Sequence, residues 1–163
     1  MRLQENISRI KQVMGILNEG KLTMLQKILM KYRDNYGKEC SSTPQGLNSG
    51  YCEDIAYDVI EELGGETSTT YLIDDGLFWN EDEEVSDYRT ESGEYWNIDN
   101  FKKYGEPPFS YDDLDKLDLN GHVWIYSNGK HYDIEAIHGV DNFWDLPLYQ
   151  RQLSGLNLVE KED

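Results

Sequence analysis

The chain is poor in cysteine, proline and positive charge. Its 163 residues include two cysteines, four prolines and 15 lysines and arginines, against 32 aspartates and glutamates. Two cysteines without secretory context make a structural disulfide the weaker expectation, so we expect reduced thiols. The cysteines and histidines have no zinc-finger or H-E-x-x-H spacing, and no glycine-rich phosphate loop is present, so we expect neither a metal nor another cofactor.

Long hydrophobic runs are also missing. No segment approaches the roughly 20 apolar residues that cross a bilayer. The opening MRLQENISRIKQVMGILNE has no uninterrupted apolar run of signal-peptide length. We therefore expect a cytoplasmic protein that has no membrane partner.

The shortage of basic residues leaves a formal net charge of −17. Residues 74–118 hold fifteen acidic and four basic residues, a net charge of −11. A field of this sign repels phosphates, which argues against free nucleic acid and anionic membrane surfaces as partners. It attracts cationic partners and proteins that normally bind DNA, although solubility alone also accounts for it.

Length predicts a single domain over residues 1–163. Apolar residues at helical spacing predict two helices, residues 3–17 and 22–36, in an N-terminal helical segment 1–36. A third helix is expected in YCEDIAYDVIEELGG, ending at Gly64-Gly65. Residues 81–118 are acidic and contain Pro107-Pro108, which predicts a long, partly ordered insertion.

The stretch GHVWIYSNGKHYDIEA, residues 121–136, predicts a β-hairpin. Asn128-Gly129 between alternating strands favours a two-residue type I′ turn. The register pairs His122 with Glu135 and makes Asp133 its diagonal neighbour, at a distance that side chains bridge. One face then carries only apolar groups and tyrosine, as a core-packed face does. The opposite face collects the other side chains: His122, Trp124, Tyr126, His131, Asp133 and Glu135.

Cys52 is the candidate nucleophile for this hairpin. It lies at or within the first turn of the third expected helix, where unpaired N–H groups and the helix dipole favour a thiolate. The neighbouring Glu53 and Asp54 oppose it. A histidine that is held by a carboxylate can activate a thiol, so Cys52, His122 and Asp133 together predict a reactive site. His131 is expected to be structural.

These residues resemble a known family. GYCEDIA, residues 50–56, resembles the G-x-C-x-D-x-A signature of transglutaminase-like proteins. HVW, residues 122–124, is similar to the H-x-W that begins their histidine strand, and YD, residues 132–133, matches the aspartate of the next strand. The resemblance implies an α+β fold of the papain-like/transglutaminase-like kind, in which a Cys-bearing helix packs against an antiparallel sheet. The core spans residues 50–150, with the acidic insertion 74–118 inside it.

The resemblance also implies cysteine-dependent acyl chemistry on a protein or peptide amide, by hydrolysis, deamidation or transfer to an amine. By matched position, Cys52 is the nucleophile, His122 the general base and acid, and Asp133 the orienting carboxylate. The acidic segment favours cationic substrates.

Supporting roles remain open between several residues. The oxyanion-hole donor is Gln45, Asn48 or the backbone N–H of Cys52. Trp124 is expected to wall the cleft, and Glu135 is the rival of Asp133 as the orienting group.

A non-catalytic function is the alternative. The opening ISRIKQVMGIL is similar to openings seen in proteins from tailed phages and their hosts. An acidic phage protein in a host cytoplasm can act as a decoy that mimics DNA and occupies a host DNA-binding or nuclease surface. The sequence leaves the substrate and the oligomeric state open.

Overall fold

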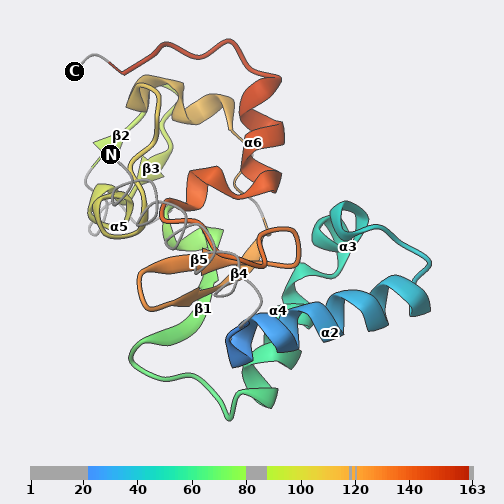
Figure 1. The fold of residues 1–163 in the computed structure, drawn as a ribbon. Coiled ribbons are helices and arrows are strands. Elements are labelled where there is room, and N and C mark those ends of the chain that lie inside the picture. The colour runs from blue at the N-terminus through green and yellow to red at the C-terminus, as the bar shows by residue number, and fades with distance from the viewer. Residues whose placement is uncertain (1–21, 80–87, 118, 120, 162–163) are drawn as a thin grey trace, which may run out of the picture.

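A three-stranded antiparallel sheet, ordered β1-β4-β5, lies at the centre of the fold (Figure 1). The structure is a computed structural model that describes residues 22–79, 88–117, 119 and 121–161. The helices and small antiparallel sheets give the α+β class that the sequence predicts. The central strands are β1 (Thr70–Asp74), β4 (Val123–Ser127) and β5 (Lys130–Tyr132).

Three helices cover one face of this sheet. The second expected helix begins at Met24, where Thr23 and Gln26 form a capping box, and it runs three residues further than predicted. The first expected helix, residues 3–17, lies outside the described residues. These helices are α2 (Met24–Glu39), α3 (Pro44–Gly50) and α4 (Cys52–Glu62). They share a buried aliphatic core with the sheet: Leu25, Ile28, Leu29, Leu47, Ile55, Val59, Ile60, Val123, Ile125 and Ile134.

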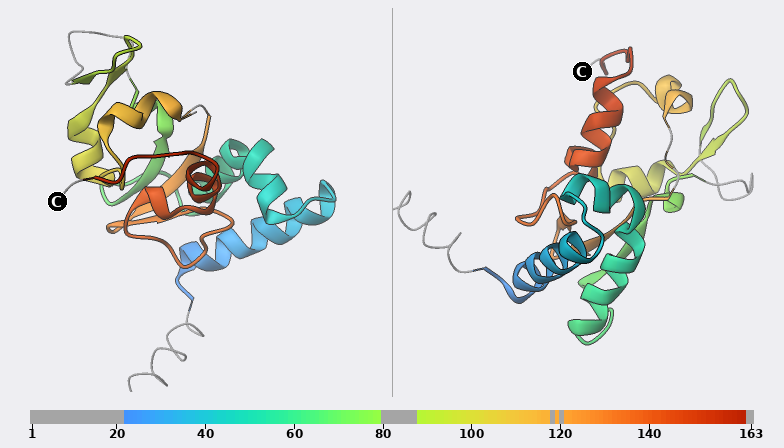
Figure 2. Two further views of the ribbon diagram at one scale, coloured as in Figure 1. Left: turned by 90° about the horizontal axis from the view of Figure 1, so that it is seen from above. Right: turned by 90° about the vertical axis from the view of Figure 1, so that its right-hand side faces the viewer.

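The opposite face of the sheet is buried under an aromatic core. Trp124, on β4, is fully buried there between rings from distant segments. These segments are α5 (Ile98–Tyr104), the 3-10 helix η4 (Phe143–Asp145) and α6 (Pro147–Ser154). Figure 2 shows them on the other side of the sheet from α2. Their buried rings are Phe101, Tyr104, Phe143, Trp144 and Tyr149.

Residues 88–117, which lie within the predicted insertion, contain regular secondary structure. They form β2 (Tyr88–Arg89), β3 (Tyr95–Trp96), α5 and the 3-10 helix η3 (Tyr111–Lys116). The acidic composition hid apolar residues at helical spacing, and some of the carboxylates serve local structure. Asp113, for example, pairs with Lys116 at 2.7 Å. The apolar residues of this segment enter the aromatic core: Trp96, Ile98, Phe101, Tyr104, Phe109 and Leu114.

The predicted hairpin forms, but its second strand is shorter than expected. Ser127 pairs with Lys130 and Tyr126 with His131, across a turn in which Asn128 and Gly129 have φ of 49° and 86°. Strand β5 then ends at Tyr132. The predicted pairing of Trp124 with Asp133 and of His122 with Glu135 is therefore wrong.

The carboxylate of Asp133 causes the early strand end. Its Oδ1 accepts the backbone N–H groups of Glu135 and Ala136 at 2.9 and 2.8 Å, which turns the chain away from the sheet. Among the described residues, no helix is long and apolar enough to cross a membrane.

Candidate active site

Cys52 is the first residue of α4, as the sequence predicts. The first N–H groups of a helix have no intrahelical partners, so the thiol lies where anions are stabilised. The side chain is partly buried, and its Sγ lies 3.4 Å from the carbonyl oxygen of Gly121, to which the neutral thiol donates. Cys52 therefore contacts the segment that leads into β4, which contains His122.

His122 and Asp133 form a buried pair. His122 Nε2 lies 3.1 Å from Asp133 Oδ2, and the two residues are 3% and 5% exposed. Because an ionised carboxylate only accepts hydrogen bonds, Nε2 carries the hydrogen. The other nitrogen, Nδ1, is buried and makes no hydrogen bond of ordinary geometry to a described residue. Nδ1 is thus the nitrogen that is left to exchange a proton with the thiol.

The three groups favour opposite charges on Cys52 and His122. Burial raises the pKa of Cys52, but the interaction with His122 and backbone N–H groups brings it below its usual value. Burial lowers the pKa of His122, whereas Asp133 and Cys52 together raise it to about 9. Burial also raises the pKa of Asp133, but the His122 contact holds it below its usual value. All three shifts act in the direction of a thiolate–imidazolium pair with an ionised carboxylate behind it.

The early end of β5 adds a donor to this site. Ile125 pairs with Tyr132, so a longer strand would have placed Ile134 opposite Val123. Without that strand, the backbone N–H of Val123 interacts with Cys52 instead, and this interaction lowers the pKa of the thiol. Sequence reasoning missed this donor because it continued the hairpin to residue 136.

Asn48 and Glu135 support the carboxylate rather than the thiol. The Asn48 Nδ2 group donates to Asp133 Oδ2 at 3.0 Å and to Glu135 Oε2 at 2.8 Å. Glu135 also accepts two hydrogen bonds from the guanidinium of Arg151, at 2.8 and 2.9 Å. Asp133, not Glu135, therefore orients His122. Asn48 has no amide hydrogen left to donate to an oxyanion.

Gln45 and Trp124 have other positions than those expected. Gln45 is exposed on α3 and lines a surface groove with Arg33 and Pro147. Cys52 does not line this groove. Trp124 donates through Nε1 to His131 Nδ1 at 2.9 Å, and its ring stacks against His122 with centroids 5.5 Å apart. Trp124 thus packs behind the imidazole. Of the three predicted oxyanion donors, the backbone N–H of Cys52 is the one left at the site.

Sequence reasoning missed Asp75 and Tyr149. Asp75 is 2% exposed and accepts the N–H groups of Gly121 and His122 at 3.0 and 3.2 Å, and the hydroxyl of Tyr149 at 3.1 Å. Burial raises the pKa of Asp75 despite these bonds. Asp75 therefore holds the backbone of Gly121 and His122 in place. In the sequence, Asp75 resembles a surface turn residue, because Gly76 follows it.

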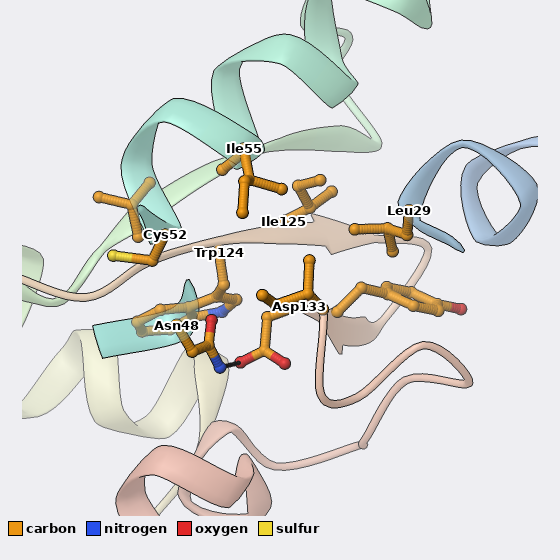
Figure 3. A pocket seen from close by; sticks show the side chains of 11 residues that line it. Leu29, Asn48, Cys52, Ile55, Trp124, Ile125 and Asp133 are labelled. Atoms are coloured by element: carbon orange, nitrogen blue, oxygen red, sulfur yellow. Dashed lines mark hydrogen bonds between the residues drawn. The ribbon is translucent and has the colours of Figure 1, made fainter. Parts of the chain in front are cut away.

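Two spaces adjoin the reactive groups. A gap of about 10 Å³, room for about one water, lies against Cys52, Asn48 and Asp133 (Figure 3). An open groove of about 410 Å³ lies on the His122 side and is also lined by Asn48. The groove therefore opens beside His122. Within the part of the chain that the structure describes, no cluster of histidine, cysteine and acidic residues suits a metal ion.

Comparisons with protein-family models, with curated proteins and with solved structures find no match to this chain. The transglutaminase-like resemblance therefore rests on its three sequence motifs.

Proposed function

We propose that this protein is a cysteine-dependent acyl hydrolase or acyltransferase that acts on amides of proteins or peptides through a papain-like/transglutaminase-like core. One observation carries the proposal. The buried His122–Asp133 pair adjoins a thiol at the start of a helix, and the three groups shift each other's pKa toward the charged forms. A histidine whose pKa is raised by both a buried carboxylate and a neighbouring thiol is typical of a nucleophilic site.

The proposed reaction has two halves. The Cys52 thiolate attacks the amide carbonyl, and a carbon–sulfur bond forms while backbone N–H groups stabilise the oxyanion. The carbon–nitrogen bond then breaks, and the proton on His122 Nδ1 goes to the leaving nitrogen, which departs as ammonia or an amine. In the second half, His122 takes a proton from water or from an acceptor amine that attacks the thioester. The carbon–sulfur bond breaks and Cys52 is restored.

The acidic binding protein stays a prediction without a specific observation in its favour. Several carboxylates between residues 74 and 118 have partners inside the fold. Asp75 holds the backbone before β4, and Asp113 accepts the N–H of Val159 at 2.6 Å. Glu106 accepts from Tyr111 and pairs with Lys161. Charge in this segment therefore builds structure as well as surface potential.

Alkylation of Cys52 tests the proposal. The other cysteine, Cys40, is replaced by serine so that Cys52 is the thiol that reacts. A free thiol of ordinary pKa is only about 1% thiolate at pH 6.5. A thiolate–imidazolium pair has far more thiolate of somewhat lower nucleophilicity, so we expect iodoacetamide to react with Cys52 roughly tenfold faster than with glutathione at this pH. The Cys52→Ser protein, which retains Cys40, is the control. A rate at Cys52 equal to that of glutathione across pH 5–9 would refute the proposal.

Replacement of His122 by glutamine should remove this reactivity. Without the imidazolium, only backbone N–H groups are left to lower the pKa of Cys52, and burial raises it. We expect the alkylation rate at pH 6.5 to fall roughly tenfold and the midpoint of the pH profile to move toward that of a free thiol. Circular dichroism checks that the variant is folded. An unchanged profile in a folded His122→Gln protein means that His122 does not serve Cys52.

A further inference from the structure

One side of the Asn48 amide has two partners and the other side has none. Both Nδ2 hydrogens go to carboxylates, those of Asp133 and Glu135. Because carboxylates accept and cannot donate, this network fixes which way the amide is turned. The Oδ1 atom therefore lies on the opposite side, where it has no hydrogen-bond partner among the described residues.

This oxygen is deeply placed beside the reactive groups. Asn48 is 1% exposed and lines both the gap that contains Cys52 and the groove that contains His122. In Figure 3 its oxygen turns away from Asp133, to the side on which Trp124 and Cys52 lie. Native proteins pair nearly all buried polar atoms, so a buried carbonyl oxygen beside an open groove is placed to accept a hydrogen bond from a group that enters the groove.

The chemistry around Cys52 is complementary to a carboxamide. An amide group offers a carbonyl oxygen, which needs donors, and an N–H group, which needs an acceptor. The N–H groups of Val123 and the first turn of α4 supply donors at the thiol. Asn48 Oδ1 is an acceptor that none of the described residues uses. An ester or a fully substituted amide has no hydrogen to give it.

We propose that Asn48 Oδ1 accepts a hydrogen bond from the N–H of the substrate amide and so makes the site selective for carboxamides that keep an N–H. This inference rests on the proposed function, since it names the substrate class of the same site. Primary amides and peptide bonds satisfy it, whereas esters and tertiary amides leave the oxygen buried and unpaired. Asn48 is then a specificity-determining residue as well as a support for Asp133.

Three alkylating reagents test this selectivity on the Cys40→Ser protein. Iodoacetamide and N-methyl-2-iodoacetamide carry an N–H, and N,N-dimethyl-2-iodoacetamide has none. Each rate at Cys52 is divided by the rate of the same reagent with glutathione. We expect the first two normalised rates to be similar and the third to be at least fivefold lower. Equal normalised rates, or an even decline with reagent size, would overturn the inference.

Asn48→Leu is the matched variant, because leucine has a similar shape and no acceptor. Its normalised rates for the three reagents should converge, whereas a steric cause of the selectivity would survive the substitution. If the variant does not fold, the reagent series on the Cys40→Ser protein decides alone. The two proposals fail differently: a Cys52 rate no higher than that of glutathione removes the proposed function, and a raised rate without selectivity removes only the role of Asn48.

Discussion

Replacement of Asp133 by alanine is expected to lower the free energy of unfolding by about 3–5 kcal/mol, the usual result of removing one partner from a buried ion pair. Asp133 Oδ2 accepts from His122 and Asn48. Its Oδ1 accepts the two N–H groups that form the turn after β5. Alanine leaves all four donors without this acceptor and leaves the imidazolium of His122 buried without its counter-charge.

Asp133→Asn separates the support of the fold from the support of the chemistry. Asparagine keeps the shape and an oxygen for the turn, so we expect a smaller loss of stability than with alanine. Because the asparagine oxygen accepts the two N–H groups of the turn, its Nδ2 group faces His122 Nε2. The ring then takes the tautomer with its hydrogen on Nδ1, which cannot accept the proton of Cys52. The alkylation rate at pH 6.5 should fall toward that of a free thiol.

Urea unfolding at pH 7 measures the stability of both variants, with Asp141→Ala as the control. Asp141 is on the same segment, is largely exposed and pairs with Lys130 at 3.3 Å, so its loss should leave the unfolding midpoint nearly unchanged. If Asp133→Ala and Asp141→Ala have the same midpoint, Asp133 does not have the structural role described here.

The site could be predicted where local rules govern it. The Asn128-Gly129 turn and the period of two determine which hairpin residues share a face, and this placed His122 near Asp133. The start of α4 follows from a loop rich in glycine, serine and proline and the apolar stripe after it. These features depend on neighbours in the sequence, so the sequence contains them.

The supporting contacts could not be predicted, because they join segments that are distant in the chain. Asn48 meets Asp133 across 85 residues, and Asp75 meets Tyr149 across 74. No periodicity links such pairs. The early end of β5 was predictable in principle, since aspartate is rare in strands and common in turns. The resemblance of Tyr132-Asp133 to the aspartate strand of transglutaminase-like proteins favoured a longer strand instead.

Acidification is expected to destabilise the protein through His131, which accepts a hydrogen bond from the tryptophan that stacks against His122. His131 Nδ1 accepts from Trp124 Nε1, and Nε2 lies 2.9 Å from the carbonyl of Tyr104. Only the neutral ring with its hydrogen on Nε2 satisfies both neighbours, because a protonated Nδ1 would face the Trp124 N–H. Burial, despite the Tyr104 carbonyl, accordingly lowers the pKa of His131 to about 4.

The sign of the effect follows from proton binding. Between pH 6.5 and 4 the imidazole of the unfolded chain takes up a proton and that of the folded chain does not, so folding stability falls as the pH falls through this window. The full difference corresponds to about 3 kcal/mol. Asp75, whose pKa is raised, acts in the opposite direction at the acid end. The contribution of His131 is therefore the difference between the wild type and a His131 variant.

His131→Gln is the variant that isolates this contribution, because glutamine offers an acceptor and a donor but does not titrate. It should be less stable than the wild type at pH 6.5 and should lose less stability between pH 6.5 and 4. His138→Gln is the control, since His138 is exposed, and its profile should follow that of the wild type. Urea unfolding at half-unit pH steps measures all three proteins. Parallel profiles for the wild type and His131→Gln would mean that the acid sensitivity of the fold arises elsewhere. A smaller slope in His131→Gln alone would show that the Trp124–His131 hydrogen bond, which lies behind the His122 ring, needs the neutral His131 ring.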